Sequence, residues 1–213
     1  MNEAYYRQHA QRFYDDTVNV DMAALYQPFI GCLPPGARIL DAGCGSGRDV
    51  KAFSKMGFAV DAFDASPELV ALARRLTGKP VEQMRFDEIN AAARYDGIWC
   101  CASLLHVPEA GLPDVMAKLA KALKPGGVWY LSFKYGSGER EKEGRRFTDM
   151  DEAGLRRIVD KLNGSFKQNS VTGESGNRLA ANIEIKKTWQ TGDLRSGRSD
   201  ERWLNAIISN NPN

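Results

Sequence analysis

The stretch that decides the fold is Ile-Leu-Asp-Ala-Gly-Cys-Gly-Ser-Gly-Arg-Asp, residues 39–49. Residues 37–41 form a short apolar run that predicts a strand, and residues 48–56 have a helical pattern that ends at Gly57. Three glycines at alternate positions make the turn between them: Gly43, Gly45 and Gly47. A strand, a glycine-rich turn and a helix in this order predict a ligand site beyond the carboxyl end of the strand.

Outward from this stretch, strand and helix patterns alternate, which predicts an α/β fold with a parallel sheet covered by helices. Further strands are predicted at 58–63, 81–84, 95–102 and 128–133, and helices within 3–30 and at 66–78 and 111–123. The last third predicts a charged loop at 135–146, a helix at 148–162, strands at 166–172 and 183–190 around a Gly/Asn turn, and a helix at 202–209. The expected architecture is a doubly wound, seven-stranded, mostly parallel sheet with an antiparallel edge hairpin.

Two acids beside the glycine turn indicate the ligand. Asp41 stands two residues before Gly43, where a carboxylate suits an ammonium group and would repel a pyrophosphate. A dinucleotide site would need a third glycine at position 48, which is Arg48. Asp64 follows Gly43 by 64 − 43 = 21 positions, close to the offset at which an acid accepts hydrogen bonds from a ribose. The pattern favours a ligand with a ribose and an amine but without crowded phosphates.

Residues 41–47, Asp64 and the segment LKPGGVWYLSF (123–133) resemble the class I S-adenosylmethionine (SAM)-dependent methyltransferases, closely over 37–134. The resemblance implies a Rossmann-like methyltransferase fold and an enzyme that converts SAM into S-adenosyl-L-homocysteine. In that family Asp41 would lie near the methionine amine, and Asp87 near the adenine amine, unless Glu82 or Glu88 shifts the alignment. The implied cofactor-binding residues are Asp41, Gly43, Gly45, Gly47, Asp64, Ala65, Asp87, Glu88 and Ala102.

The acceptor side carries weaker signals. His106 ends the fourth strand and is the candidate catalytic residue, either orienting an acceptor or acting as a base; the alternative is a histidine that bonds backbone. Tyr6 and Tyr14 are expected either to line the pocket from a helical lid or to pack between helices. Residues 47–66 also resemble the tellurite-resistance type of the family, which acts on small or soft acceptors. The cations of 133–152 have three possible roles: to bind an anionic acceptor, to shield the site, or to belong to a solvated flexible loop. The nearby acids almost cancel their charge, which favours the solvated loop.

Composition narrows the possible partners and location. The 213 residues carry 29 basic and 27 acidic side chains, a net charge of +2 that gives no general field for nucleic acid. The Asp/Asn-Pro-Pro-aromatic and Pro-Cys motifs of nucleobase methyltransferases are absent. No leader or membrane span is predicted, the four cysteines are expected to be reduced, and no metal site is expected. We expect a cytoplasmic monomer or homodimer.

The predicted organisation is one methyltransferase domain over 1–213, with a helical lid at 1–30, a cofactor-binding core at 37–134 and an acceptor-side region at 135–213. The predicted activity is methyl transfer from SAM to a small molecule. The alternatives are an RNA- or protein-directed methyltransferase, a non-catalytic SAM-binding module, and a nicotinamide oxidoreductase, which Arg48 disfavours.

Overall fold

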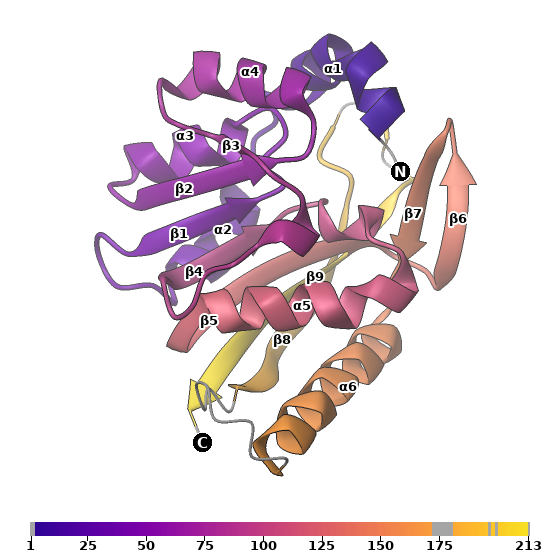
Figure 1. Cartoon of the computed structure of the whole chain (residues 1–213). Coiled ribbons are helices and arrows are strands. Elements are labelled where there is room, and N and C mark those ends of the chain that lie inside the picture. The colour runs from indigo at the N-terminus through magenta and orange to yellow at the C-terminus, as the bar shows by residue number, and fades with distance from the viewer. Residues whose placement is uncertain (1–2, 172–180, 196, 199, 213) are drawn as a thin grey trace.

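The computed structural model describes residues 3–171, 181–195, 197–198 and 200–212, and over these ranges its main feature is a seven-stranded sheet (Figure 1). The strand order is β3-β2-β1-β4-β5-β9-β8. The strands are β1 (Arg38–Ala42), β2 (Ala59–Asp64), β3 (Glu82–Gln83), β4 (Tyr95–Cys100), β5 (Leu123–Lys134), β8 (Ala181–Gly192) and β9 (Arg202–Pro212). The first five pair in parallel, whereas β9 is antiparallel to both β5 and β8. The predicted seven-stranded sheet with an antiparallel edge hairpin is confirmed, but β8 and β9 form the hairpin instead of the predicted strands at 166–172 and 183–190.

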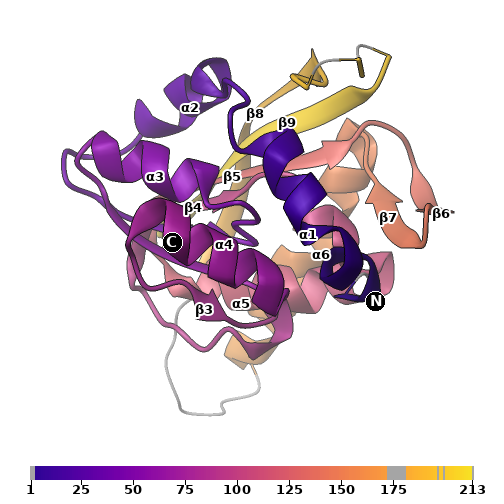
Figure 2. The ribbon, with the colours of Figure 1, turned by 90° about the horizontal axis from the view of Figure 1, so that it is seen from above.

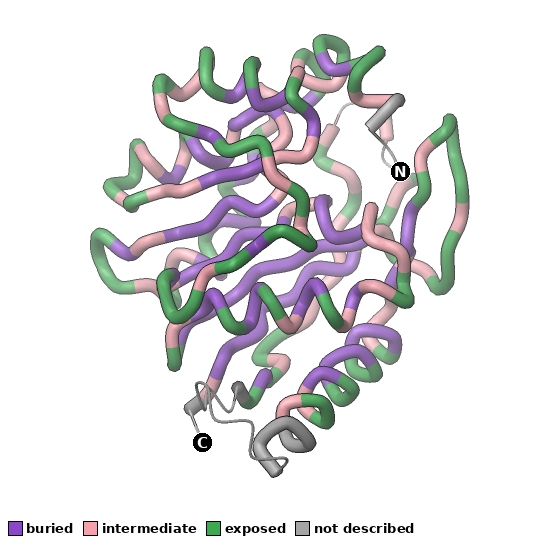
Figure 3. Tube along the Cα trace, viewed as in Figure 1, coloured by how far each residue is buried: buried purple, intermediate pink, exposed green. Residues whose placement is uncertain are grey.

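Helices cover both faces of this sheet (Figure 1). They are α1 (Glu3–Thr17), α2 (Ala23–Ile30), α3 (Arg48–Lys55), α4 (Pro67–Thr77), α5 (Leu112–Ala122) and α6 (Glu152–Val171). The core divides along the strands: Trp99 of β4 packs with α2 and α3, whereas its neighbours Ile98 and Cys100 pack with α5 and α6. Because successive side chains of a strand point to opposite faces, a strand buried on both faces is mainly apolar, as predicted for β4, whose trace is mostly buried (Figure 3) and whose one charged residue is Asp96.

The turn and cap signals of the first half are confirmed in detail. The Ser66 hydroxyl accepts a hydrogen bond from the Leu69 N–H, Pro67 occupies the first turn of α4, and Gly78 ends the helix at φ 65°. None of the described helices combines the length and the hydropathy that crossing a bilayer requires.

The charged loop predicted at 135–146 is wrong, because this segment contributes to a second sheet. Strand β6 (Gly138–Lys142) pairs with β7 (Arg145–Asp149) as an antiparallel hairpin. Its two-residue turn, Glu143-Gly144, has positive φ at both positions, the geometry that matches strand twist. Phe147 and Thr148 of β7 are buried, and this anchors the hairpin to the molecule.

Of three other expectations for the last third, one is right except for its bounds and two are wrong. The helix predicted at 148–162 is α6, but it starts at Glu152, because Thr148 and Asp149 belong to β7. The strand predicted at 166–172 is the continuation of α6 to Val171; Thr172 and the predicted Gly/Asn turn lie outside the described residues. The helix predicted at 202–209 is strand β9, which is inserted between β5 and β8 and buried on both faces.

Helix α1 lies over the carboxyl edge of the sheet and passes between α4 and β7 (Figure 2). Its Ala10 packs against Leu69 and Leu72 of α4. At its other side, the Arg145 guanidinium of β7 lies 4.2 Å from the Tyr5 ring centroid. The helix therefore closes over the edge at which the sequence places the ligand.

Candidate active site

A cavity of about 620 Å³ opens beneath α1 at the carboxyl ends of the parallel strands. This volume lies in the range of small-molecule sites, roughly 300–1,000 Å³. One end is bounded by the glycine bend after β1, and the other by β5, the β6–β7 hairpin and β9. Of the residues predicted to bind the cofactor, those that line the cavity are Tyr6, Gly43, Gly45, Asp64, Ala65, Asp87 and Ala102.

The glycine bend presents bare backbone to the cavity. Gly43 has φ 79°, and a Cβ atom there would lie 2.6 Å from the Ser103 Cβ. The Ser103 hydroxyl donates to the Ala42 carbonyl at 2.7 Å and so fixes the bend against the loop after β4. Gly47 does not line the cavity; a Cβ there would meet Ala73 of α4 at 2.9 Å, so this glycine lets α3 and α4 pack.

Asp64 ends β2 and its carboxylate lines the cavity. Its two oxygens accept the backbone N–H groups of Gly45 and Ser66, both at 2.9 Å. Burial raises the pKa of this carboxyl, although those two bonds act in the opposite direction. An ionised carboxylate has about four acceptor sites, so acceptor capacity remains for a ligand while the backbone fixes the orientation.

Asp41 is not a wall of the cavity but lies buried behind the bend. Its Oδ2 atom has no hydrogen-bond partner among the described residues. Burial, and then the Asp49 carboxylate, raise the pKa of Asp41 well above its ordinary value, while Arg48 opposes them. The two acids predicted to flank the bend therefore differ: Asp64 faces the ligand space and Asp41 supports it from behind.

A buried ion pair that the sequence analysis missed holds this end of the site together. Arg48 binds Asp49 through two contacts of 2.6 and 2.9 Å, and Tyr26 and the Trp99 indole also donate to Asp49. Burial would raise the pKa of Asp49, but Arg48 and these donors outweigh it and lower the pKa. Arg48 and Asp49 line the cavity as well. In the sequence, Arg48 only disfavours a dinucleotide turn. The one sign of this ion pair is that the opposite charges of Arg48 and Asp49 are adjacent.

The predicted adenine end is built mainly from apolar side chains. Met84 and Phe86 line it, and Phe86 packs edge-on against Phe63 at 5.3 Å between centroids. Asp87 lines the cavity and pairs with Arg85 at 2.7 Å. Glu88 does not line it; its carboxylate accepts the Arg85 N–H at 2.7 Å.

Tyr6 and His106 meet inside the cavity, Tyr6 from α1 and His106 from the loop after β4. The His106 Nδ1 lies 3.1 Å from the Arg146 carbonyl, which can only accept, so Nδ1 carries the proton. Nε2 is then the acceptor for the Tyr6 hydroxyl, 2.9 Å away. Burial lowers the pKa of His106 to about 4 and raises that of Tyr6 to about 12. Both groups are neutral at pH 7.

The second lid tyrosine is placed elsewhere. Tyr14 does not line the cavity but packs in the cluster between α1 and α4. Phe13 lines the cavity in its place, and its ring would lie 3.0 Å from a Cβ atom on Gly45. Helical spacing identifies the inner face of α1 but does not determine which of two adjacent aromatics points inward.

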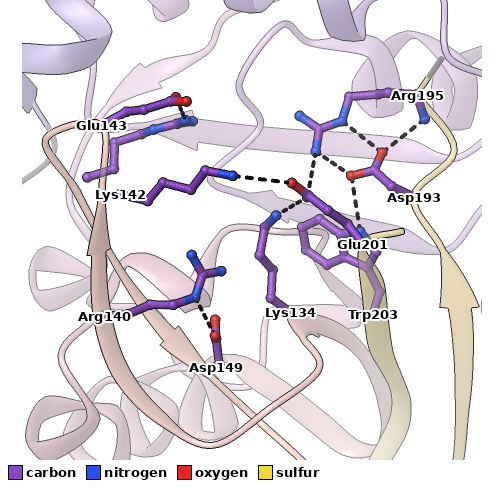
Figure 4. A network of polar contacts seen from close by, with 10 residues as sticks. Lys134, Arg140, Lys142, Glu143, Asp149, Asp193, Arg195, Glu201 and Trp203 are labelled. Carbon is purple, nitrogen blue, oxygen red and sulfur yellow. Dashed lines mark hydrogen bonds and ion pairs between the residues drawn. The ribbon is translucent and has the colours of Figure 1, made fainter. Parts of the chain in front are cut away.

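The far end of the cavity is lined by charged and aromatic side chains that the sequence analysis did not group. Lys134 of β5 and Lys142 of β6 both reach toward Glu201, and Arg195 pairs with Asp193 beside it (Figure 4). The rings at this end belong to Phe147 and Trp203. Lys134 and Lys142 belong to the predicted charged segment, and both line the cavity, Lys134 from β5 as a nearly buried side chain and Lys142 from β6 as a partly exposed one.

Comparisons with known proteins agree with this fold. A family model described as a methyltransferase domain matches residues 6–163. The ubiquinone biosynthesis O-methyltransferase of Xanthomonas campestris pv. campestris (strain B100) is 36% identical over 105 residues, which are 46% of this chain and 43% of that protein. The chain thus spans less than half the length of the curated relatives it matches.

Two solved structures have the same fold at low identity. The 1,6-didemethyltoxoflavin-N1-methyltransferase of Burkholderia thailandensis, with bound 1,6-didemethyltoxoflavin and S-adenosylhomocysteine, superposes with a TM-score of 0.71 at 19% identity, over 98% of this chain and 85% of that one. A TehB-like SAM-dependent methyltransferase from Corynebacterium glutamicum ATCC 13032 gives 0.67 at 19%, over 97% and 98%.

The fold and the glycine bend define the class of α/β proteins whose ligand site lies beyond the carboxyl edge of a parallel sheet. Because the family model covers most of the chain, this protein belongs to the methyltransferase domain family. The resemblance to class I SAM-dependent methyltransferases, carried by residues 41–47, Asp64 and 123–133, is confirmed.

Proposed function

We propose that this chain transfers a methyl group from SAM to a small-molecule acceptor. The observation that carries the proposal is that one cavity joins the Gly43–Gly45 bend and the Asp64 carboxylate to the polar and aromatic end near His106. Donor and acceptor positions within one space are what a direct transfer needs, since alignment alone supplies about 7–11 kcal/mol.

The residues of the bend suit SAM. Asp64 has acceptor sites for ribose hydroxyls, the bare backbone at Gly43 allows close approach, and the unpartnered Asp41 Oδ2 provides an acceptor behind the bend for an N–H or water donor. When bound, SAM supplies an electrophilic methyl group on a sulfonium. The apolar side chains of Met84 and Phe86 suit the adenine end, with Asp87 at its rim.

The contribution of the chain is then to orient the reactants and exclude water. Tyr6 and Phe13 of α1 form the cover of the cavity, in agreement with the lid expected at 1–30. We assign 37–134 to the donor end and 135–213 to the acceptor end. Because His106 has a pKa near 4, it is a weak base, and its Nε2 is better suited to accept a hydrogen bond that positions Tyr6 or an acceptor hydroxyl.

Several features favour a small acceptor. The acceptor end is lined by inward-facing side chains beneath α1, and the motifs of nucleobase methyltransferases are absent from the chain. The relatives compared above carry names that refer to ubiquinone biosynthesis and to 1,6-didemethyltoxoflavin. The size of the cavity is appropriate for a cofactor and one such molecule.

Calorimetric titration with S-adenosylhomocysteine tests the donor site. Asp64→Ala should weaken binding by about 10- to 150-fold, the equivalent of 1.5–3 kcal/mol for a hydrogen bond to a charged group. Asp61→Ala is the matched control, since Asp61 lies on the same strand but pairs with Arg38 and Arg94 outside the cavity. Equal affinity in the wild-type and Asp64→Ala proteins would contradict the proposed donor site.

Incubation with methyl-labelled SAM and a cell extract tests the acceptor class. After ultrafiltration, label should appear in the low-molecular-weight fraction. Label found in RNA or protein would favour a macromolecular acceptor. Binding of S-adenosylhomocysteine without any transfer would favour a non-catalytic module.

A further inference from the structure

The far end of the cavity has a specific chemistry: cations that converge on aromatic rings. Lys134, at the end of β5, and Arg145, at the start of β7, both line the space. Their side chains are 12% and 11% exposed, so these two cations are nearly buried. Phe147 lies between them, with the Lys134 ammonium 5.8 Å and the Arg145 guanidinium 5.2 Å from its ring centroid.

The resident carboxylates do not balance the cations around Lys134. Lys134, Lys142 and Arg195 all contact the single carboxylate of Glu201, and among the described residues Asp193 is the other acid that pairs with one of these three cations; Glu143 and Asp149 in Figure 4 pair with other arginines. Three cations therefore face two carboxylates. Asp193 is already engaged, since it accepts hydrogen bonds from Arg195 and from the Trp203 indole. Burial lowers the pKa of Lys134 despite Glu201, which agrees with incomplete charge compensation.

Arg145 lines the cavity, where it also interacts with the Tyr6 hydroxyl, and it keeps one unused donor. Its Nε atom is buried and has no hydrogen-bond partner among the described residues. Its Nη2 atom pairs with Glu143, whose side chain is 60% exposed, at 2.9 Å. An ion pair with such an exposed carboxylate contributes little and is easily exchanged. A guanidinium can bind a carboxylate through two parallel hydrogen bonds, and Arg145 is held for this by packing against Tyr5 and Phe147.

Aromatic groups shape the same space. Phe147 and the His106 ring lie 5.2 Å apart, and Trp203 lines the wall near Lys134, whose ammonium is 5.2 Å from its centroid. Walls of this kind suit a flat ring, and the cations suit an acidic substituent on that ring. Because these cations line the space beneath α1 rather than an open face, they suit a small anion better than a polynucleotide backbone.

We propose that the acceptor is an aromatic or heteroaromatic acid, a planar ring bearing a carboxylate or an acidic hydroxyl, and that Lys134 and Arg145 bind its negative charge. This inference rests on the function proposed above. In this arrangement Glu143 and Glu201 are the resident counter-ions, and the acid replaces Glu143 on Arg145. The cations also favour the ionised form of an acidic hydroxyl, so the acceptor needs no strong base, in agreement with the low basicity of His106.

The test compares two matched probes, 4-hydroxybenzoate and the neutral 4-hydroxybenzamide, on the whole protein saturated with S-adenosylhomocysteine. Isothermal titration should show the benzoate binding at least about tenfold more tightly than the amide. Lys134→Gln and Arg145→Gln should each lower the ratio of the benzoate affinity to the amide affinity by about tenfold, which corresponds to a loss of roughly 1.4 kcal/mol. Lys186→Gln is the control, since Lys186 pairs with Glu184 away from the cavity.

Two further measurements separate the possible failures. Arg145→Lys keeps the charge but loses the planar fork, so it should recover part of the preference and report on a folded protein. Each variant should bind S-adenosylhomocysteine as the wild type does. If the wild type binds that ligand but shows no preference for the benzoate, or if both Gln variants keep the preference, the acid site is refuted while the donor site stands. If S-adenosylhomocysteine does not bind at all, the proposed function itself fails, and this inference with it.

Discussion

Replacing Asp49 with Asn tests whether the buried ion pair beneath the glycine bend stabilises the whole site. The Asp49 side chain is 6% exposed; its carboxylate binds Arg48 with two hydrogen bonds and accepts from Tyr26 and Trp99. Its partners belong to α2, α3 and β4, so one carboxylate joins three elements. An asparagine amide keeps a single oxygen acceptor and places an N–H₂ group against the guanidinium, which leaves Arg48 buried without its counter-ion.

The magnitude follows from this geometry. Removing one partner of a buried ion pair costs about 3–5 kcal/mol, because the remaining charge stays buried and unpaired. In a chain of this length, 1 kcal/mol corresponds to about 2–4 °C, so Tm should fall by about 6–20 °C. Tyr26→Phe removes one donor to the charged carboxylate and should cost about 1.5–3 kcal/mol. Asp61→Asn, in a pair whose Arg38 partner is 43% exposed, should cost about 1 kcal/mol or less.

Thermal unfolding followed by circular dichroism, with urea unfolding as the second measurement, distinguishes these values. The pH dependence gives an independent check. The folded-state pKa of Asp49 is lowered, so its stabilisation is present above pH 3.8 and is lost as pH falls through the folded-state pKa. Asp49→Asn should remove this acid-dependent loss. A Tm within about 3 °C of the wild type, or no difference from Asp61→Asn, would refute the structural role of the pair.

Two further perturbations test the bend and the lid contact. In Gly43→Ala an alanine must adopt φ near 79°, and its Cβ would lie 2.6 Å from that of Ser103. The free energy of unfolding measured in urea should therefore fall by about 2–4 kcal/mol. Adding Ser103→Gly should restore part of it; no recovery would mean that the clash is not the cause. His106 has a pKa lowered from 6.5 to about 4. Between these values the unfolded chain binds a proton that the folded chain does not, so stability falls as pH drops from 6.5 to 4. In His106→Asn this loss should shrink, and an unchanged pH profile of unfolding would contradict a buried neutral histidine.

The first part of the chain was predicted from sequence almost as it folds. Strand β1, the glycine bend and helix α4 follow from signals that lie next to one another, such as Ser66-Pro67 at a helix start and Gly78 at its end. These signals act through local backbone geometry, so nothing distant is needed to interpret them. For the same reason the sequence identified Gly43, Gly45 and Asp64, which the structure brings to one cavity.

The last third could not be predicted in the same way, because its structure depends on pairing between distant segments. Residues 202–209 were predicted to form a helix, yet they form a strand since β5 and β8 supply hydrogen-bonding partners on both sides. The β6–β7 hairpin was hidden by its charges, although Glu143-Gly144 has the composition of a tight turn. Context of this kind overrides the weak local preference of a short segment.

The sequence by itself determined the class of the protein and the glycine-bend end of its cavity, because the backbone conformation there requires particular residues at fixed spacing. Only the tertiary structure decided that Asp41 lies behind the bend and that Asp49 joins three elements. It also decided that Lys134, Arg145 and Glu201, which come from different strands and the chain leading into β9, surround one space. The physical reason is that burial and the electrostatic field at a side chain depend on neighbours in space, and a one-dimensional pattern does not contain those neighbours.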